Sequence, residues 1–310
     1  MRKMIVAAAV LAVTSAHAAE GLKFGDLNYF FKAGQVNALA NFNSSYNKQK
    51  VVSTMEETRG YIIETQLTYG VSDQLNVFLG LDYAYDLQTE ISGNSDYDND
   101  GLANPALGAN YRLMNQSATS YNIDLGAVAR VNVQDAETGS SGVGTSEDGN
   151  YAGYKESRSS LEVNGKIGRK WNESNEWQLA AGVEYFKDGE STAPGTTDVD
   201  SDLDSSMDLY LRAAYQYRPV NEIMFLLSAQ ATQVGEKKSE DDTNTKTTED
   251  SHMDIDMHFT VKYLVTDTFI TKFNYGMSRN ADFDLKTGAT SDEVSNRREN
   301  FFGLGVDFLF

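Results

Sequence analysis

Twelve segments of this chain alternate apolar and polar side chains with a period of two, which is the pattern of β-strands with one face against an apolar medium. The alternation is clearest in residues 75–86, where Leu75 and Leu79 fall on one face and Asn76 and Asp82 on the other. The segments lie near residues 36–46, 61–71, 75–86, 107–113, 121–131, 161–167, 177–185, 207–217, 223–231, 253–263, 269–277 and 302–310. A chain patterned in this way is restricted to all-β architectures.

The connections between these segments alternate in length along the whole chain. Short turns near residues 72–74, 114–119, 170–176, 218–222 and 265–267 alternate with long, mostly acidic loops near residues 47–57, 88–101, 135–157, 188–205, 235–251 and 280–298. Composition alone permits a soluble β-sandwich, but a sandwich has no reason for this alternation. The pattern predicts a transmembrane up-and-down antiparallel β-barrel of about twelve strands over residues 35–310, with short periplasmic turns and long extracellular loops.

Aromatic residues gather at the two ends of the predicted strands. One set lies at the turn ends: Tyr69, Tyr111, Tyr121, Trp171, Trp177, Tyr217, Tyr263, Phe269 and Phe310. A second set lies near the loop ends: Tyr46, Tyr61, Tyr85, Tyr185 and Tyr275. A soluble core would place these rings in the middle of the strands, whereas a membrane barrel places them in two interfacial belts.

Residues 1–18 have the three parts of a signal peptide, with basic residues, an apolar run and a small-residue site that predicts cleavage after Ala18. No later stretch has about 20 consecutive apolar residues, as a transmembrane helix needs. Residues 19–34 form a short lead before the first strand, and the sequence does not decide whether this lead is a plug, a cap or an extra strand. The chain has no cysteine and therefore no disulfide. The predicted location is the bacterial outer membrane.

The exported chain is strongly acidic. The signal peptide carries two of the 26 basic residues, so the 45 acidic residues exceed the remaining 24 by 21. Nucleic acid needs a basic surface and is therefore excluded as a partner. The partners we expect are outer-membrane lipid and lipopolysaccharide, the machinery that inserts barrels, and small solutes.

The polar face of the strands is predicted to line a lumen. Its acidic members are Glu64, Asp82, Asp86, Asp124, Glu162, Glu184, Asp208, Asp254, Asp256 and Asp307; its basic members are Arg112, Arg130, Lys166, Arg212, Lys262 and Lys272, and His258 also points inward. Ten acidic against six basic residues favours cations modestly. Twelve strands fall between barrels filled by side chains and the wide porins, so any channel is narrow.

Two pairs within this lumen set are informative. Arg112 and Asp124 are placed to pair across their hairpin, and pairs of this kind would brace a packed interior rather than line an open one. Glu64 and Asp82 are expected to lie opposite each other across the turn at 72–74, which brings like charges together. Such a pair binds a cation, shares a proton or has a basic neighbour. Bracing and channel lining both remain open.

The last strand ends the chain on its apolar face. Phe302, Leu304, Val306, Phe308 and Phe310 fall on one side of it. A final strand that ends in an aromatic residue resembles the C-terminal signature strand of bacterial outer-membrane β-barrels. That resemblance implies that these five residues are read by the insertion machinery. The last strand must also pair with the first, so that no open edge remains in the bilayer.

Residues 61–85 followed by residues 101–113 resemble the paired strands of the outer-membrane family labelled for the meta-pathway of phenol degradation. Tyr111-Arg112 matches the end of that family's pattern, whereas Gly101-Leu102-Ala103-Asn104 stands where a glycine-aspartate start would be. The match covers about a sixth of the chain. It implies a transporter or channel for small, often aromatic or apolar compounds.

A surface hydrolase is an alternative that the sequence raises at one place. His252, Asp254, Asp256 and His258 alternate along one strand near its loop end, a level at which barrels resembling the outer-membrane proteases use aspartate and histidine. A phospholipase-like set would instead need its histidine at the lipid boundary, and His258 points inward. No second aspartate pair is placed opposite, so no residue is assigned a catalytic role.

One acidic loop contains half of a calcium-binding motif. Asp96, Asp98 and Asp100 precede Gly101 with the oxygen spacing that opens a calcium loop, but Leu107 stands where the bidentate glutamate belongs. A solvated acidic loop is the favoured interpretation, and calcium is the only cofactor that the sequence suggests.

Together these features predict an outer-membrane channel for passive passage of small solutes through a narrow, mildly cation-favouring lumen. The main alternative is a non-conducting barrel that displays acidic loops for surface contact or envelope integrity.

Overall fold

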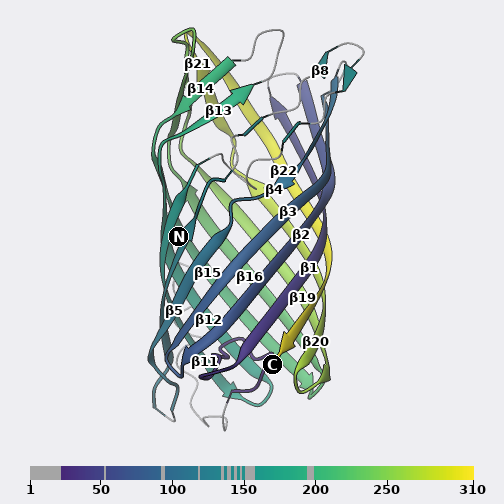
Figure 1. Ribbon diagram of the computed structural model, residues 1–310, viewed down its shortest axis with the longest axis vertical. Coiled ribbons are helices and arrows are strands. Elements are labelled where there is room, and N and C mark those ends of the chain that lie inside the picture. The colour runs from purple at the N-terminus through teal and green to yellow at the C-terminus, as the bar shows by residue number, and fades with distance from the viewer. Residues whose placement is uncertain are drawn as a thin grey trace.

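The computed structural model describes residues 22–51, 54–91, 95–117, 119–133, 136–137, 141–142, 145–146, 149–150, 158–193 and 199–310. The predicted signal peptide and its cleavage site lie outside these residues. No helix among the described residues is long and apolar enough to cross a membrane. The chain folds into an all-β cylinder whose strands run obliquely to its long axis (Figure 1).

Twelve antiparallel strands form the closed wall of this cylinder. They are β1 (Val36–Val51), β2 (Thr54–Ser72), β3 (Leu75–Ile91), β5 (Ala106–Met114), β6 (Asn122–Arg130), β11 (Ser160–Asn172), β12 (Asn175–Phe186), β15 (Ser206–Val220), β16 (Ile223–Val234), β19 (His252–Thr266), β20 (Phe269–Asn280) and β22 (Thr290–Leu309). Each strand pairs with the next in this order. The predicted up-and-down barrel of twelve strands is confirmed.

The first and last strands close the ring. β1 pairs with β22 so that Ala38 lies opposite Phe308 and Phe42 opposite Leu304. The amide of Phe310 donates to the carbonyl of Val36, and the amide of Val36 donates back to Phe310. Closure of this kind leaves no strand edge of the wall unpaired, which the interior of a bilayer requires.

Short turns and long connections meet at opposite ends, which we call the turn end and the loop end. At the turn end the connections β2–β3, β11–β12, β15–β16 and β19–β20 each span only two residues. The C-terminus lies at this end, at the bottom of Figure 1.

The predicted long loops are only partly loops, because the structure extends many of them as strands. The additional strands are β4 (Ser95–Leu102), β7 (Ala136–Glu137), β8 (Ser141–Gly142), β9 (Thr145–Ser146), β10 (Gly149–Asn150), β13 (Gly189–Ala193), β14 (Val199–Leu203), β17 (Lys237–Asp241), β18 (Lys246–Glu249) and β21 (Phe283–Thr287). β14 pairs with β17, β17 with β18 and β18 with β21, so this side of the wall continues upward. Both faces of β17 and β18 are polar, so a search for apolar alternation misses them.

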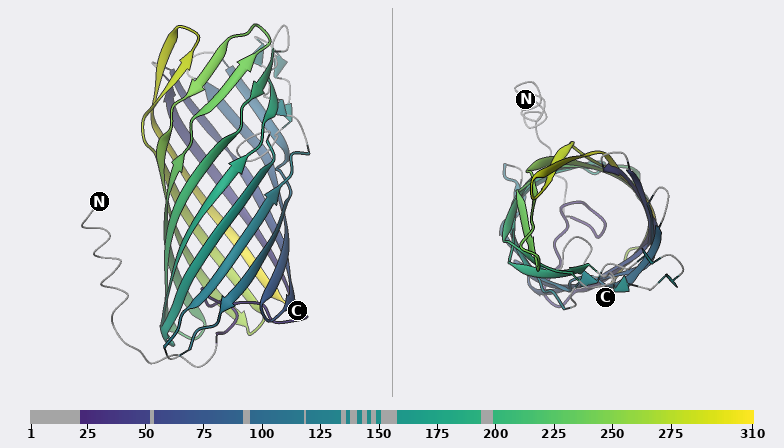
Figure 2. Two further views of the ribbon diagram at one scale, coloured as in Figure 1. Left: turned by 90° about the vertical axis from the view of Figure 1, so that its left-hand side faces the viewer. Right: turned by 90° about the horizontal axis from the view of Figure 1, so that it is seen from above.

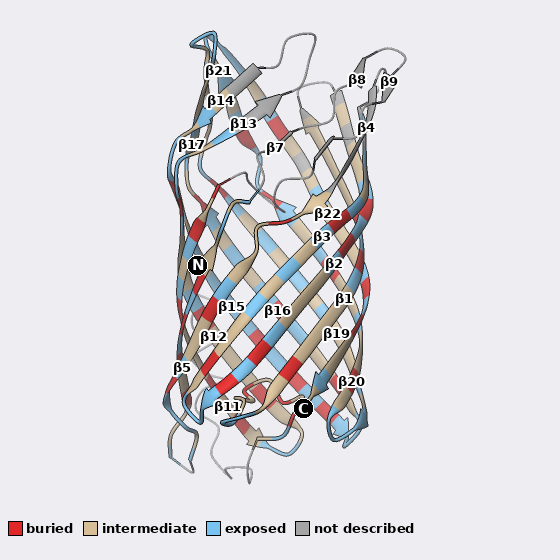
Figure 3. Cartoon of the chain, in the orientation of Figure 1, coloured by how far each residue is buried: buried red, intermediate tan, exposed pale blue. Residues whose placement is uncertain are grey.

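The barrel is apolar outside and polar inside, the reverse of a soluble protein. Side chains that point outward are large, apolar and exposed, such as Leu304 at 65% and Leu211 at 61%, while polar side chains such as Asn164 and Gln216 are buried on the inner face. Buried, half-buried and exposed residues alternate along the strands of the wall (Figure 3). The sequence leaves the orientation of β16 open because both its faces are apolar. The structure points Leu227 outward and buries Met224 completely.

A substitution on the outer face tests which medium it contacts. Leu211 lies midway along β15, between Tyr217 at the turn end and Met207, which pairs with Tyr185 near the loop end. Leu211→Arg is expected to lower the free energy of unfolding in phospholipid vesicles by about 2–4 kcal/mol, because arginine at mid-bilayer loses its hydration. A urea titration followed by tryptophan fluorescence measures this change.

Gln230 supplies the matched control for Leu211. It lies on the neighbouring strand, opposite Arg212, and faces the lumen. Gln230→Arg should lower the free energy of unfolding by no more than about 1 kcal/mol, because the new charge remains in water and meets only the repulsion of Arg212. An equal loss in both variants would contradict the assignment of the two faces.

Candidate functional site

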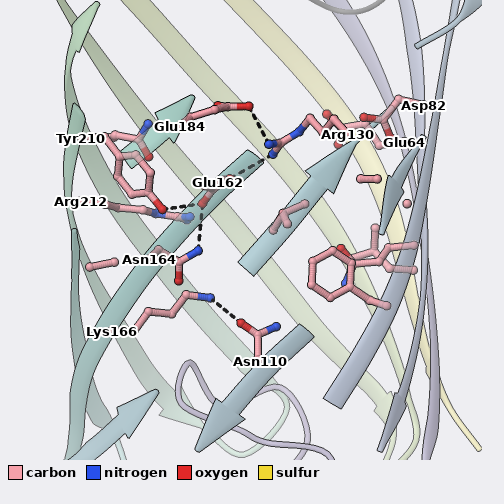
Figure 4. Close-up of a pocket in the computed structure, with 18 of the residues that line it drawn as sticks. Glu64, Asp82, Asn110, Arg130, Glu162, Asn164, Lys166, Glu184, Tyr210 and Arg212 are labelled. Carbon is pink, nitrogen blue, oxygen red and sulfur yellow. Dashed lines mark hydrogen bonds and ion pairs between the residues drawn. The ribbon is translucent and has the colours of Figure 1, made fainter. Parts of the chain in front are cut away.

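The barrel encloses a cavity of about 660 Å³ in its middle, above the turn end. Eight of the charged residues predicted to face the lumen line it: Glu64, Asp82, Arg130, Glu162, Lys166, Glu184, Asp208 and Arg212 (Figure 4). Each points inward because the period of two puts every second side chain of its strand on the inner face. We call this space the central cavity.

Arg130 organises one side of the central cavity. Its guanidinium donates to Glu184 at 2.8 Å and to Glu162 at 3.2 Å. Glu162 also accepts from the Tyr210 hydroxyl at 2.6 Å and from the Asn164 amide at 2.9 Å. Charges held in this way stay fixed to the wall, because each carboxylate has several donors.

Glycines in the wall make room for two aromatic rings of the central cavity. A Cβ on Gly182 would lie 2.6 Å from the Tyr210 ring on the next strand, and a Cβ on Gly108 would lie 2.2 Å from Phe78. The rings therefore lie against bare backbone instead of projecting further into the lumen. Both are lining residues, so the two glycines widen the space open to a solute.

Residues 22–35 cross the inside of the barrel at the turn end, and we call this segment the plug (Figure 2). Phe24 packs in an apolar cluster with Met224 and Ile270. Further along the plug, the amide of Gly34 donates to Gly70, and the amide of Gly70 donates to Gln35. Contacts with strands around the ring hold the plug across the lumen.

A buried carboxylate anchors the plug. Asp26 is fully buried and forms ion pairs with Lys170 at 2.9 Å and Arg218 at 2.6 Å, both almost completely buried. The carbonyl of the neighbouring Gly25 accepts from Gln216 and Lys262, each at 3.2 Å. Four side chains from the barrel wall therefore fix two adjacent residues of the plug.

Arg112 holds the plug at a second point. Its guanidinium donates to both oxygens of Asp124, at 2.7 and 2.9 Å, and to the carbonyl of Asn28 at 3.0 Å. It also lies over the Phe30 ring, with 4.5 Å from its central carbon to the ring centroid. The Arg112–Asp124 pair thus braces the plug against the wall.

Three cavities follow one another from the middle of the barrel to the turn end. The central cavity shares lining residues such as Gln66 and Phe78 with a smaller cavity of about 190 Å³ beside the plug. The smaller cavity in turn shares Tyr29, Phe30 and Arg112 with a third of about 430 Å³. The smallest of the three cavities therefore lies where the plug meets Arg112.

The other residues predicted for the lumen lie outside the central cavity. Lys262 contacts the plug and also donates to Gln216 at 2.9 Å, and Lys272 forms an ion pair with Asp307 near the turn end. Asp254 and Asp256 lie further up β19, toward the loop end. Lys262 therefore helps to hold the plug, and the Lys272–Asp307 pair links neighbouring strands of the wall.

Asp86 departs from the expected geometry. It lies at a β-bulge in β3 with a positive φ of 53°, four residues beyond Asp82 toward the loop end. A bulge interrupts the alternation of faces on which the lumen prediction for Asp86 depended. Among the described residues that line the central cavity, Asp86 is absent.

The two histidines of the cluster that raised the hydrolase alternative lie in different environments. The His252 side chain is buried against Phe283, with 3.4 Å between its Nε2 and Asp254. The His258 ring packs against Phe301, with 5.1 Å between the ring centroids. Because the His252 side chain is only 2% exposed, it is closed to a substrate.

The calcium prediction depends on three aspartates of one strand. Asp96, Asp98 and Asp100 lie in β4, but their side chains fall outside the described part of the chain. Where side chains are described, no group of histidine, cysteine, aspartate or glutamate is arranged to hold a metal ion.

Three residues that anchor the plug were not predicted from the sequence. Lys170 and Arg218 continue the inward face of β11 and β15 beyond Lys166 and Arg212, so the same alternation extended to the strand ends would have found them. No such signal marks Asp26, because it lies in the lead, whose place in the barrel the sequence does not decide. Its partner Lys170 is 144 residues away along the chain.

No protein-family model matches this chain, and no curated relative matches it either. The chain is similar to the crystal structure of an outer-membrane channel from Pseudomonas putida F1, with 12% identity, a TM-score of 0.59 and coverage of 94% of this chain and 100% of that chain. It is more distantly similar to the NanC porin, with 8% identity, a TM-score of 0.45 and coverage of 86% and 98%. The first likeness, taken with the closed ring of twelve strands, shows that this chain has the fold of a bacterial outer-membrane barrel.

Proposed function

We propose that the protein is an outer-membrane channel for the passive passage of small polar solutes. The observation that carries this proposal is the series of three cavities from the middle of the barrel to the turn end. They share lining residues, and charged and amide side chains line the largest of them. The plug narrows this route and limits it to small solutes.

The turn end is proposed to face the periplasm, and the extended strands of the loop end the outside. The lengths of the connections support this orientation, because outer-membrane barrels have short periplasmic turns and longer extracellular loops. Tyr69, Tyr111, Tyr217 and Tyr263 are exposed at the turn end, where an interfacial belt belongs. Phe302, Leu304, Phe308 and Phe310 are exposed on the outer face of β22, where insertion machinery and lipid would meet them. Lipid and lipopolysaccharide would cover the rest of the apolar wall.

The resemblance to the phenol-degradation family suggests a channel, but the lumen favours another solute class. Glu64, Arg130 and Lys166 line the central cavity, and the apolar side chains among its lining residues are few. Burying an uncharged aromatic compound against charged groups costs their hydration. Polar solutes suit this lining better than apolar ones.

Planar bilayer recording tests the proposal. The purified, folded protein is expected to conduct in steps of small amplitude, because the plug crosses the route and leaves a cavity of only about 190 Å³ beside it. In a potassium chloride gradient the reversal potential should show a modest cation preference, because five acidic and three basic side chains line the central cavity. The bilayer without protein is the blank.

Absence of conductance from both the intact protein and a form without the plug would overturn the channel proposal. That result would instead favour the non-conducting barrel. A preference for anions would contradict the charge argument while leaving the channel in place.

A further inference from the structure

Four charged side chains of the central cavity lie outside its ion-pair network. Glu64 and Asp82 face each other across β2 and β3, as the sequence predicts. Among the described residues, neither forms an ion pair, and the one side-chain hydrogen bond to Glu64 comes from Asn41 at 3.2 Å. We call these two carboxylates the acidic pole.

Lys166 and Arg212 form a matching basic pole. Lys166 donates to Asn110 at 3.4 Å, and within the described part of the chain neither Lys166 nor Arg212 makes an ion pair. Arg212 is exposed to the water of the lumen. The nearest acid on its own strand, Asp208, accepts instead from the amide of Gly235 at 2.9 Å. Both cations are therefore open to a solute.

The two poles face each other across the lumen. In the ring of twelve strands, β15 lies six strands from β2, so Arg212 and Glu64 stand on opposite walls. Figure 4 shows Glu64 and Asp82 on one side of the central cavity and Lys166 and Arg212 on the other. All four residues line the same space.

The charges between the poles do not cancel them. Arg130 is shared by Glu162 and Glu184 at 2.8 to 3.2 Å, so these three groups keep one net negative charge, and Tyr210 and Asn164 also hold Glu162 at the wall. Among the described residues, a solute therefore meets two carboxylates without an ion pair on one wall and two cations without an ion pair on the other. A field directed from the basic to the acidic pole therefore crosses the route that a solute would take.

From this arrangement we propose that the central cavity selects zwitterionic solutes, whose cationic end it binds at the acidic pole and whose anionic end it binds at the basic pole. This inference rests on the proposed channel function. A solute with a single charge meets one attractive and one repulsive wall, whereas a zwitterion that turns across the lumen meets two attractive walls. A neutral solute is attracted to neither wall.

Swelling of proteoliposomes in isosmotic solute tests this selectivity. Glycylglycine is a zwitterion, and N-acetylglycinamide is a neutral compound of similar size. A charge contact at about 4 Å in water contributes about 1 kcal/mol, so the channel should admit glycylglycine about fivefold faster for each pole that it contacts. Glycylglycinamide and N-acetylglycinate serve as the singly charged comparisons and should be slower than glycylglycine.

Two variants with the net charge of the intact protein make the test specific. Glu64→Arg with Arg212→Glu places opposite charges within each pole, and should remove the preference for glycylglycine. Adding Asp82→Lys and Lys166→Glu to that pair rebuilds both poles with the field reversed, and should restore the preference. All four side chains face water in the lumen, so the barrel should tolerate these changes.

The outcomes separate this inference from the proposed function. A protein that admits all the solutes at equal rates is a channel without this selectivity, and the inference fails. The inference also fails if the first variant retains the preference for glycylglycine. If the protein admits no solute, with or without its plug, the proposed channel function itself is overturned.

Discussion

Asp26→Ala is expected to release the plug from the barrel. Removing one partner of a buried ion pair typically costs 3–5 kcal/mol, because the remaining charges lose their compensation. Here Lys170 and Arg218 would both remain buried without Asp26. The plug can leave and let water reach them, so the cost should appear as opening of the plug rather than unfolding of the barrel.

Hydrogen exchange measures this opening directly. The amide of Tyr29 donates to Asp26, and the amide of Gly34 donates to Gly70. Both should exchange roughly a hundredfold faster or more in the variant, as expected from a loss of 3 kcal/mol or more. Amides in the middle of β15 should keep their protection.

Glu173→Gln is the matched control for Asp26. Glu173 also contacts Lys170, at 3.6 Å, but its side chain is 60% exposed. An exposed pair contributes only about 0–1 kcal/mol, so exchange of the plug should change little. Equal effects of the two variants would show that burial of Asp26 is not what anchors the plug.

Deleting residues 22–31 is expected to raise single-channel conductance severalfold. The plug contributes residues 27–31 to the lining of the smallest cavity, about 190 Å³, and it also separates that cavity from the larger space at the turn end. Without it the narrowest stretch of the route would open to the width of the barrel. Lys170, Arg218 and Lys262 would then face water, so the wall itself should survive.

Phe30→Ala refines the deletion experiment. Phe30 lines both the small cavity and the space below it, and the Arg112 guanidinium packs over its ring. Its loss should give a conductance between those of the intact protein and the deletion. Lys238→Gln, which breaks an exposed pair with Glu236 at the loop end, should leave conductance unchanged. A deletion that conducts no better than the intact protein would show that the plug is not the narrowest point.

The strands were predictable because each carries its own signal. Leu79 and Leu81 point outward and are exposed, and Asp82 on the same strand lines the central cavity, as their alternation predicts. The pairing of Glu64 with Asp82 follows from the length of the turn between their strands. The face of a strand residue and the register of a hairpin depend on a few neighbouring residues, and therefore they can be predicted from the sequence.

Other features were not predictable from local patterns. The strands above the membrane level, such as β17 and β18, are polar on both faces and have no alternation to detect. The bulge at Asp86 shifts the register of β3 at a single residue. In both cases pairing with a neighbouring strand, rather than the segment's own sequence, decides the structure.

By itself, the sequence determined the class of fold, the number of strands in the barrel wall, the face of most of their side chains and the excess of acidic over basic residues. Only the tertiary structure decided which charges meet. Asp26 lies between Lys170 and Arg218, and Arg212 lies across the lumen from Glu64, because closing twelve strands into a ring brings distant segments to one level. The physical reason is that apolar alternation is imposed by the medium on each strand separately, whereas ion pairs and open poles depend on the shear and closure of the whole barrel.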